Sequence, residues 1–554
     1  MNNIKITALH SSVRVLLAAA ALVAAAGIAF SQAPAPLTPA AMKPIAHVSD
    51  RFQSFNIEMV EVTGGRFWAP YKPVASGPAA APDIKPSATP SGIDSSRFRY
   101  RSPIDLSDPR LIKLARALGP TYIRVSGTWA NSTFFDDSGA AAPAKAPEGF
   151  GGVLTAKEWQ GVLDFSKAID AQILTSLAIS PGVRDAQGVW TPAQAEKLLA
   201  FTKAHGGQIA VAEYFNEPTF AAMGGAPKGY NAEAYGRDFK IFAAFLRKNS
   251  PDTLIVGPDS VGDGPSLADS MKPKTKPGQT PAAAPMGMAL PPIIKTEEML
   301  TAEGRGGIDG FAYHFYGGVS QRCRGANDID ADPAHELLKP EWLNRTNNEE
   351  AYYQKIRDQY EPGKPMWLTE TAEAACGGDP WASTFVDSFR YLHQLGSLAK
   401  VGVQAVMHNT LAASDYGLID ESTLQPRPNY WSAVLWSKLM GSQVLEAAAP
   451  AVENQYVYAH CLKSVQGGVA LLVLNADHDN PQTIHLGKAA ERYTLTADDL
   501  LGHTAKLNGT ELQLTAAGDL PTLAGQKAPA GAITLAAASL NFFAIPGANN
   551  PACR

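Results

Sequence analysis

The stretch AEYFNEPTF (residues 212–220) gives the strongest indication of the fold of this chain and of its chemistry. Its alanine and aromatic residues are typical of a buried strand, and Pro218 ends that strand because proline has no N–H to donate to a ladder. Asn216 and Glu217 stand side by side just before this stop. A carboxamide and a carboxylate at the end of a buried strand raise the question of what they serve there.

Seven further runs of this kind, short and rich in apolar or β-branched residues, occur along the chain. They are SFNIEMV (54–60), TYIRVSG (121–127), ILTSLAIS (173–180), TLIVGPDS (253–260), GFAYHFY (310–316), MWLTE (366–370) and AVMHNTL (405–411). Segments between them carry apolar residues at helical spacing, namely 108–119, 155–170, 191–206 and 383–402. Alternating strands and helices predict a parallel sheet, and eight repeats predict a closed (β/α)8 or TIM barrel. An open doubly wound sheet is the alternative, but the glycine-rich phosphate turn expected after an early strand is missing.

The helical period disappears after about residue 440, where short alternating runs are separated by Gly, Asn and Asp. This pattern predicts an all-β domain, most simply a sandwich that supports the barrel, with a ligand-binding module as the alternative. The predicted organisation is a signal peptide over 1–33, a Pro/Ala linker over 34–48, a catalytic barrel over 49–435 and a β-sandwich over 436–554. Two Pro-, Gly- and Ala-rich stretches, 64–100 and 262–292, are expected to be long loops at the barrel rim.

The N-terminus is expected to direct export. Lys5 and Arg14 precede the apolar run VLLAAAALVAAAGIAF, and SQA at 31–33 fits a cleavage site between small residues. A membrane anchor is the alternative, but the run is short for a span. We therefore expect a periplasmic or extracellular protein whose mature form has no membrane segment.

The four cysteines are Cys323, Cys376, Cys461 and Cys553. An even number in an exported protein permits two disulfides. Pairing Cys323 with Cys376 and Cys461 with Cys553 is favoured, because each pair then lies within one predicted domain. The connectivity cannot be settled from the sequence.

Composition excludes some classes of function. The 554 residues carry a net charge of −5 and lack the basic excess of a nucleic-acid-binding protein. The sequence has no Cys/His cluster with zinc spacing, no P-loop and no dinucleotide fingerprint. We expect no metal and no organic cofactor.

Glu217 ends the fourth predicted strand, and Glu370, in PMWLTETAEAACGG, ends the seventh. The carboxyl ends of barrel strands meet at one rim, so these two side chains are expected to face each other. Facing carboxylates are what glycosidic-bond cleavage needs, since one gives a proton to the leaving oxygen while the other attacks or stabilises the anomeric carbon. Each charge raises the pKa of the other group, which keeps one proton bound near neutral pH. Asn216 is placed to donate a hydrogen bond to a sugar 2-hydroxyl.

Asn-Glu on strand four with Glu on strand seven resembles the retaining clan A glycoside hydrolases. More specifically, the chain is similar to glycoside hydrolase family 79, the heparanase and β-glucuronidase family. The segments that carry the resemblance are DPRLIKLARALGPTYIRVSGT (108–128), YFNEPTF (214–220), LIVGPDS (254–260), YHFYGG (313–318), WLTETAEAACGG (367–378) and SDYGLIDESTLQPRPNYWSAVLWSKLMGSQVL (414–445).

This resemblance implies that Glu217 is the general acid/base, Glu370 the nucleophile and Asn216 the partner of the 2-hydroxyl. It further implies that Tyr316 hydrogen-bonds Glu370 and that Glu58 contacts sugar hydroxyls. Other expected substrate-binding positions are His314, Thr128 and Asn131, together with Tyr416, Gly377 and Gly378 for a uronic acid carboxylate. Ala375 and Cys376 depart from heparanase, where a tyrosine and a glycine are expected.

The expected partner is a carbohydrate carrying β-linked glucuronic acid, with no nucleic acid involved. Few basic residues lie near the predicted site, namely Arg322, Arg324, Lys272, Lys274 and Lys276. A retaining exo-β-glucuronidase is therefore preferred to a heparanase-like endo-enzyme, which must grip a sulfated polyanion. Two competing hypotheses are a carbohydrate-binding barrel without turnover and a clan A glycosidase for neutral sugars.

Overall fold

The computed structural model describes residues 36–71, 88–140, 143, 145–266, 293–324 and 332–554. The predicted signal peptide lies outside these ranges, as does most of the rim loop 262–292 and the middle of the rim loop 64–100. Within the described ranges, no helix combines the length and the apolar character needed to cross a bilayer.

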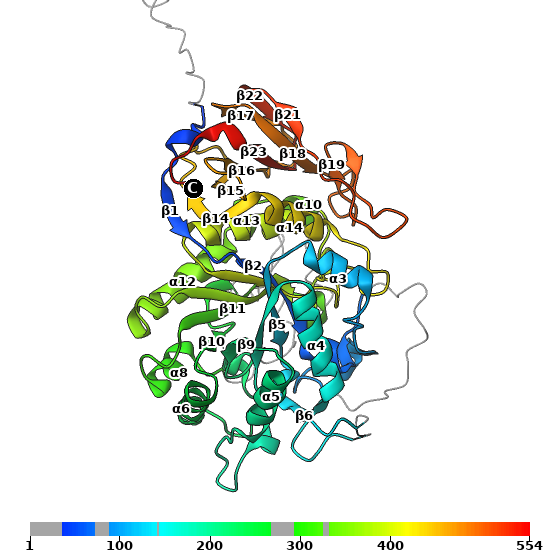
Figure 1. The fold of residues 1–554 in the computed structure, drawn as a ribbon, viewed down its shortest axis with the longest axis vertical. Helices are drawn as coiled ribbons and strands as arrows, with labels where there is room; N and C mark the ends of the chain where they lie inside the picture. The colour runs from blue at the N-terminus through cyan, green and yellow to red at the C-terminus, as the bar shows by residue number, and fades with distance from the viewer. Residues whose placement is uncertain (1–35, 72–87, 141–142, 144, 267–292, 325–331) are drawn as a thin grey trace, which may run out of the picture.

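Eight parallel strands close into a barrel, as the sequence predicts (Figure 1). In chain order they are β2 (Gln53–Glu58), β5 (Thr121–Ser126), β8 (Ala171–Ser176), β9 (Ile209–Glu213), β10 (Leu254–Ser260), β11 (Gly310–Val319), β12 (Met366–Ala375) and β13 (Ala405–His408). A helix follows each strand, namely α3 (Pro109–Arg116), α4 (Ala156–Ala168), α5 (Ala193–Ala204), α6 (Ala232–Asn249), α8 (Thr296–Glu303), α12 (Arg345–Tyr360), α13 (Asp387–Lys400) and α14 (Pro428–Leu439). The TIM-barrel prediction is confirmed.

Local sequence explains where these elements begin. Asp108 caps α3 by accepting hydrogen bonds from the backbone N–H groups of Arg110 and Leu111. Thr155 and Glu158 form a capping box at the start of α4. Strands β2 and β5 are buried along their whole length, because one face fills the barrel and the other packs under the helices.

Three strands near the expected site end elsewhere than the sequence indicates. β9 stops at Glu213, before Asn216 and Glu217, while β11 and β12 continue past Tyr316 and Glu370. The two longer strands extend together, since their last residues still pair with each other. A register shift after Tyr313 then sets His314 directly opposite Glu370.

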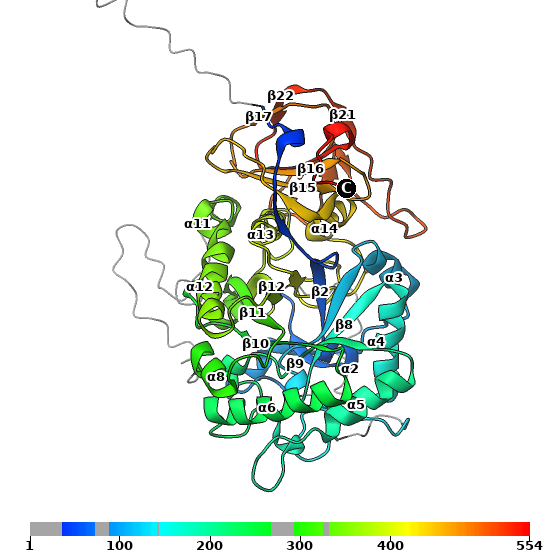
Figure 2. The same cartoon turned by 60° about the vertical axis from the view of Figure 1, so that its left-hand side comes forward.

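The C-terminal region forms an antiparallel sheet that lies against helices α13 and α14 on the outside of the barrel (Figure 2). Its order is β1 (Pro44–His47), β14 (Met440–Leu445), β15 (Gln455–Leu462), β16 (Val469–Asn475), β23 (Ser539–Ile545), β18 (Ala490–Thr496), β19 (Lys506–Leu507) and β20 (Thr510–Glu511), with β21 (Gln526–Ala528) also paired to β18. A separate ribbon is made of β17 (Gln482–Leu486) and β22 (Gly531–Leu535). Strand β1 comes from the segment expected to be a linker, so part of that segment is an edge strand of the sheet.

Both faces of the large sheet are covered. On β16, Leu472 and Leu474 belong to the core shared with the barrel helices, while Leu471 and Val473 belong to the core shared with the β17–β22 ribbon. This is why β16 is buried at every residue, where alternation of buried and exposed residues was expected. The result is a two-layer all-β unit fixed to the barrel.

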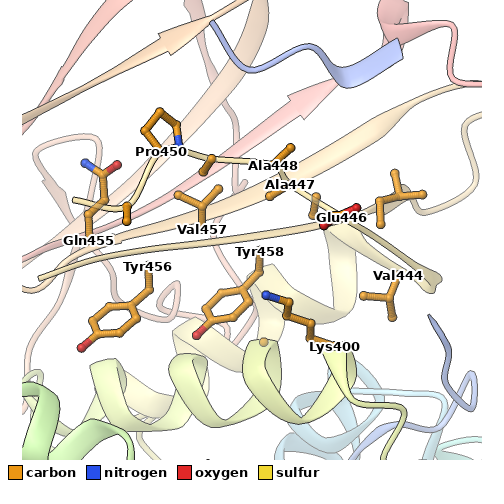
Figure 3. Close-up of a pocket in the computed structure, with 15 residues that line it drawn as sticks. Lys400, Val444, Glu446, Ala447, Ala448, Pro450, Gln455, Tyr456, Val457 and Tyr458 are labelled. Carbon is orange, nitrogen blue, oxygen red and sulfur yellow. The ribbon is translucent and has the colours of Figure 1, made fainter. Parts of the chain in front are cut away.

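Helix α13 forms much of the junction between the barrel and this sheet. Figure 3 shows Tyr456 and Tyr458 of β15 directed toward α13, with Val457 directed to the other face of the strand. The Tyr458 hydroxyl hydrogen-bonds His393 Nδ1 at 2.9 Å, and a side chain at Gly396 would collide with the Tyr458 ring. The aromatic side chains of β15 at this junction therefore hold the sheet against the barrel.

The disulfides are Cys323–Cys376 and Cys461–Cys553, the pairing favoured from the sequence. The first joins α9 (Gln321–Arg324) to the turn that follows β12. The flanks of the rim loop 64–100 form a two-stranded ribbon of β3 (Gly65–Trp68) and β4 (Phe98–Arg101). Both features lie at the end of the barrel where the expected catalytic residues are found.

Candidate active site

Glu217 and Glu370 meet at the carboxyl end of the barrel, although they come from opposite parts of the sequence. A carboxylate oxygen of Glu217 lies within 4.8 Å of a carboxylate oxygen of Glu370. A ring nitrogen of His314 lies within the same distance of both oxygens. The Glu370 side chain is 7% exposed, whereas the Glu217 side chain is 20% exposed. The two acids therefore face each other, and Glu217 is the more accessible to solvent.

Glu217 has a left-handed backbone conformation, with φ 49° and ψ 60°, between the end of β9 and the short helix η5 (Pro218–Phe220). This conformation is strained for a residue with a Cβ and is found where surrounding structure enforces it. Asn131 supplies part of that constraint, because its side-chain amide both accepts from the Asn216 N–H at 2.9 Å and donates to the Asn216 C=O at 3.0 Å. The role of Asn131 in the structure is to fix the backbone that presents Glu217.

Two donors hold Glu370 in place. Tyr316 donates from its hydroxyl to Glu370 Oε1 at 2.5 Å, and Arg124 donates from Nη1 to Glu370 Oε2 at 2.7 Å. Each oxygen of the carboxylate thus has its own hydrogen bond. These contacts fix the orientation of the carboxylate at the site.

Arg124, on β5, was not predicted from the sequence and is the centre of the site. Its guanidinium also donates to Glu213 Oε1 at 2.7 Å and to Asn216 Oδ1 at 2.8 Å. The side chains of Arg124 and Glu213 are 1% and 0% exposed, so this ion pair is fully desolvated. One buried cation therefore connects the strand of Glu370 with the turn that carries Glu217.

The hydrogen bonds of His314 define its tautomer. Arg124 Nη2 lies 3.2 Å from His314 Nε2, and because a guanidinium can only donate, Nε2 must accept. The ring proton then resides on Nδ1, which is 3.1 Å from Glu217 Oε1. Burial lowers the pKa of His314 to about 4, so the ring is neutral and donates this proton to Glu217.

Burial also controls the protonation of Glu217. Desolvation raises its pKa to about 7, with Arg124 opposing the shift and Glu213 adding to it. Since Glu217 Oε1 accepts from His314, the carboxyl proton belongs on Oε2. Below the barrel mouth, burial and the neighbouring Glu213 raise the pKa of Asp259 well above its usual range, and Thr369 donates to this carboxyl at 3.0 Å.

Glu58, Tyr316 and Tyr416 meet around Asn409, a second residue that was not predicted from the sequence. The Asn409 amide nitrogen lies 3.1 Å from Glu58 Oε1, 3.0 Å from the Tyr316 hydroxyl and 3.2 Å from the Tyr416 hydroxyl. Burial, followed by the charge of Glu370, raises the pKa of Glu58 well above its usual range. A side chain at Gly127 would overlap the Glu58 carboxyl, so glycine is required there.

The glycine turn after β12 lies beside this group. Cys376, Gly377 and Gly378 have φ values of 65°, 80° and 85°, three consecutive left-handed residues. A Cβ on Gly377 would lie 2.5 Å from Trp68, and one on Gly378 would lie 3.4 Å from the Tyr416 ring. The turn is therefore packed between the β3–β4 ribbon and the loop that carries Tyr416.

Thr128 and Arg322, which were also expected near the substrate, make contacts within the protein. Thr128 makes a long contact, with its hydroxyl 3.5 Å from the Asn216 amide nitrogen. Arg322 is not a solvated surface charge, because its side chain is 6% exposed and donates to the backbone of Ala69, Cys376 and Gly378 while pairing with Asp415. Arg322 thus ties the rim segments together, and nothing is described for the side chain of Arg324 or for Lys272, Lys274 and Lys276.

Among the described residues, three groups of side chains approach the spacing of a metal site. Two lie within the network above, and Arg124 already supplies the positive charge between their carboxylates; their members are Glu213, Asp259 and His314, and Glu217, His314 and Glu370. The third, made of His335, His478 and Asp479, lies at the surface between α10 (Pro333–Glu336) and the loop after β16.

Comparison with known proteins gives no matching family model. Curated relatives are nevertheless similar along most of the chain. Heparanase-like protein 1 from Arabidopsis thaliana is 25% identical over 83% of this chain and 88% of its own length, and hyaluronoglucuronidase from Hirudo nipponia is 26% identical over 81% and 92%. Baicalin-β-D-glucuronidase from Scutellaria baicalensis is 35% identical, but over 35% of this chain and 38% of its own.

Solved structures share the fold at lower identity. A 4-O-α-L-rhamnosyl-β-D-glucuronidase from Fusarium oxysporum has a TM-score of 0.54 and 14% identity, with 93% of this chain and 99% of that chain covered. A family 51 arabinofuranosidase from Xanthomonas axonopodis has a TM-score of 0.56 and 17% identity, with 91% and 98% covered.

The barrel, the facing acids and these relatives define the protein as a glycoside hydrolase. More narrowly, the chain is similar to heparanases and a β-glucuronidase that are members of glycoside hydrolase family 79, and the resemblance seen in the sequence motifs is confirmed.

Proposed function

We propose that the protein is a retaining exo-β-glucuronidase, which releases terminal β-linked glucuronic acid through a covalent glycosyl-enzyme. The observation that carries this proposal is the approach of the Glu217 and Glu370 oxygens to within 4.8 Å. Retaining enzymes place their two carboxyl groups about 5–5.5 Å apart, whereas inverting enzymes need about 6.5–9.5 Å to admit a water molecule.

In the first step, Glu217 Oε2–H protonates the glycosidic oxygen while Glu370 attacks the anomeric carbon. Arg124 and Tyr316 orient the attacking carboxylate, and His314 holds Glu217 by its other oxygen. The leaving alcohol takes the proton, and the sugar becomes esterified to Glu370. Asn216 is positioned by Asn131 and Arg124 to meet the 2-hydroxyl, where a hydrogen bond strengthens as positive charge develops.

In the second step, Glu217, now ionised, removes a proton from a water molecule that attacks the anomeric carbon. The ester bond to Glu370 breaks, and the product keeps the β configuration because the carbon has been inverted twice. Glu217 regains its proton and Glu370 its charge, so the site returns to its starting state.

The preference for a uronic acid is supported by the relatives, since those named glucuronidases match this chain. Tyr416 and the Gly377–Gly378 turn are the groups we assign to its carboxylate. Backbone N–H groups in left-handed turns bind anions without a net positive surface, which suits a chain of charge −5.

Exo-cleavage is supported by the rim. Trp68 packs directly over Gly377, and Arg322 is committed to contacts within the protein and is not available to bind a sulfated chain. The second candidate function is an endo-β-glucuronidase that acts on heparan-type chains, because some relatives of this chain are named heparanase. The sizes of the products from heparan fragments distinguish the two modes.

The direct test compares 4-nitrophenyl β-glucuronide with 4-nitrophenyl β-glucoside. We expect release of nitrophenol from the glucuronide, little or none from the glucoside, and β-glucuronic acid as the first product seen by proton NMR. Equal turnover of both substrates rejects the uronic acid preference and supports a neutral-sugar glycosidase. First appearance of the α-anomer rejects retention, and binding without turnover supports a non-catalytic carbohydrate-binding protein.

The pKa of Glu217 predicts the alkaline side of the pH profile. The first step requires its proton, which is bound below a pH of about 7 and lost above it. We therefore expect kcat/KM for the glucuronide to fall about tenfold per pH unit above that point, because a single ionisation is lost. The profile should be measured with a substrate whose leaving group needs protonation, since a 4-nitrophenol leaving group partly bypasses the acid. A profile that stays flat to pH 9 contradicts the assignment.

A further inference from the structure

Asn409, which directly follows β13, is a buried junction between three groups assigned to the reaction. Its amide nitrogen is within 3.2 Å of oxygens from Glu58, Tyr316 and Tyr416, and the residue is 1% exposed. Its own Oδ1 is buried and has no hydrogen-bond partner among the described residues. An amide that places its nitrogen toward three oxygens, while its oxygen remains unpaired, is oriented for donation.

The orientation of this amide follows from Tyr316. The Tyr316 hydroxyl has a single proton, which it donates to Glu370 Oε1 at 2.5 Å. At its contact with Asn409, the same hydroxyl can therefore only accept. The atom of Asn409 that faces it must be Nδ2 and not Oδ1.

This orientation determines what Tyr416 can do. Its hydroxyl faces the same Nδ2 at 3.2 Å and therefore accepts from it, which leaves the Tyr416 proton unused. No acceptor for that proton is found in the part of the chain that the structure describes, and the residue is 2% exposed. A buried hydroxyl proton beside Glu370 and the glycine turn is thus available for an acceptor that arrives with the substrate.

Glu58 carries the third oxygen that faces this amide, and the two N–H protons of Nδ2 are shared among the three oxygens. Its Oε1 accepts from Asn409 at 3.1 Å, and its Oε2 is buried without a partner among the described residues. Burial and the nearby Glu370 raise the pKa of Glu58 well above its usual range, which reduces the negative charge that this carboxyl adds to the pocket. An anionic sugar group can then be accepted beside Glu370 with fewer opposing charges.

We propose that Asn409 is a positioning residue that sets the donor direction of two tyrosines, so that Tyr316 holds Glu370 while Tyr416 presents its O–H to the carboxylate of the sugar. The inference rests on the proposed function, because it takes the uronic acid preference as given. It adds a physical cause for that preference, because the selectivity for an anionic C6 group would depend on the neutral side-chain amide of Asn409, which does not contact the substrate itself.

The test is the Asn409→Asp variant, which keeps the shape of the side chain but accepts hydrogen bonds where asparagine donates. Both tyrosine protons are expected to turn toward the new carboxylate. We expect the ratio of kcat/KM for 4-nitrophenyl β-glucuronide to that for the β-glucoside to fall by about 10- to 100-fold, the value of one hydrogen bond to a charged group. The glucoside rate falls as well, but less, through the loss of the Tyr316 contact.

A double-mutant cycle with Tyr416→Phe separates this effect from simple charge repulsion. If Asn409 acts through the Tyr416 hydroxyl, Asn409→Asp lowers the selectivity ratio in the parent and hardly changes it in the Tyr416→Phe background. An equal loss of selectivity in both backgrounds overturns the proposal. Tyr316→Phe is the comparison variant, because it should slow both substrates to a similar extent and leave their ratio unchanged.

Asn409→Ala, measured in the same two backgrounds, provides the answer if the aspartate variant does not fold. It removes the donor without adding charge, and its smaller loss of selectivity must also disappear with Tyr416→Phe. A parent enzyme that prefers the glucuronide, together with Asn409 variants of unchanged selectivity, overturns only this inference. A parent enzyme without that preference overturns the proposed function and the inference with it.

Discussion

Replacing Glu370 with alanine is expected to lower kcat on 4-nitrophenyl β-glucuronide by at least about 10⁴-fold, since removal of a catalytic nucleophile costs that much or more. No other described carboxylate is held by both Arg124 and Tyr316, so no neighbour can take over the attack. The measurement is single-substrate kinetics on purified protein whose folding is verified by circular dichroism. Parent-like turnover by Glu370→Ala contradicts the assignment of the nucleophile.

Glu217→Ala is the matched comparison, because the two acids have different tasks. Loss of the general acid should hardly slow the first step with a 4-nitrophenol leaving group, which departs without protonation, but should stop hydrolysis of alkyl glucuronides. Azide, which needs no general base, should restore turnover of Glu217→Ala and form β-glucuronyl azide. The same azide rescue in Glu370→Ala, and not in Glu217→Ala, would exchange the two roles.

Replacing Arg124 with methionine should produce the largest change in stability. The substitution leaves Glu213 and Glu370 buried without their cation, and breaking a buried pair in this way costs about 3–5 kcal/mol. We expect the free energy of unfolding at pH 7.5, measured with urea, to fall by this amount. A loss below about 1 kcal/mol would show that the network does not depend on Arg124.

The pH dependence of this loss has a definite sign. Without the cation, the folded-state pKa values of the buried carboxyls rise above their unfolded values, so the folded state binds more protons than the unfolded state. The variant therefore regains stability as the pH falls from 8 toward 5, and its deficit relative to the parent narrows. Arg184→Met is the control, because Arg184 also pairs with a buried acid, Asp238, but makes no contact with the two catalytic candidates. It should lose stability and keep the parent kcat.

The barrel could be predicted from the sequence because its strands, buried on both faces, are apolar runs separated by helices of ordinary period. The facing acids could be predicted because strand order fixes which ends share a rim. The end of β9 was not predicted correctly, since a left-handed Glu217 depends on Asn131, a contact distant in sequence. The assigned chemical roles of these residues remain predictions.

Arg124 and Asn409 were missed for different reasons. In the segment TYIRVSG (121–127), Arg124 is a single polar residue within an apolar strand, and its sequence neighbours do not indicate that its side chain faces the barrel interior. Its signal lies in the fold itself, because an arginine on a strand buried on both faces requires acidic partners. Asn409 follows β13 at the same rim as the acids, so the rule applied to Glu370 would have identified it as well.

Strand β1 pairs with β14, although almost the entire barrel separates them along the chain. During synthesis, residues 44–47 emerge from the ribosome long before their partner exists, so the C-terminal sheet can be completed only when translation is nearly over. A C-terminal domain produced by itself would expose the unpaired edge of β14, and this edge could pair with the same edge of another molecule and cause self-association. Attempts to express the two units separately should therefore co-supply the segment that precedes the barrel.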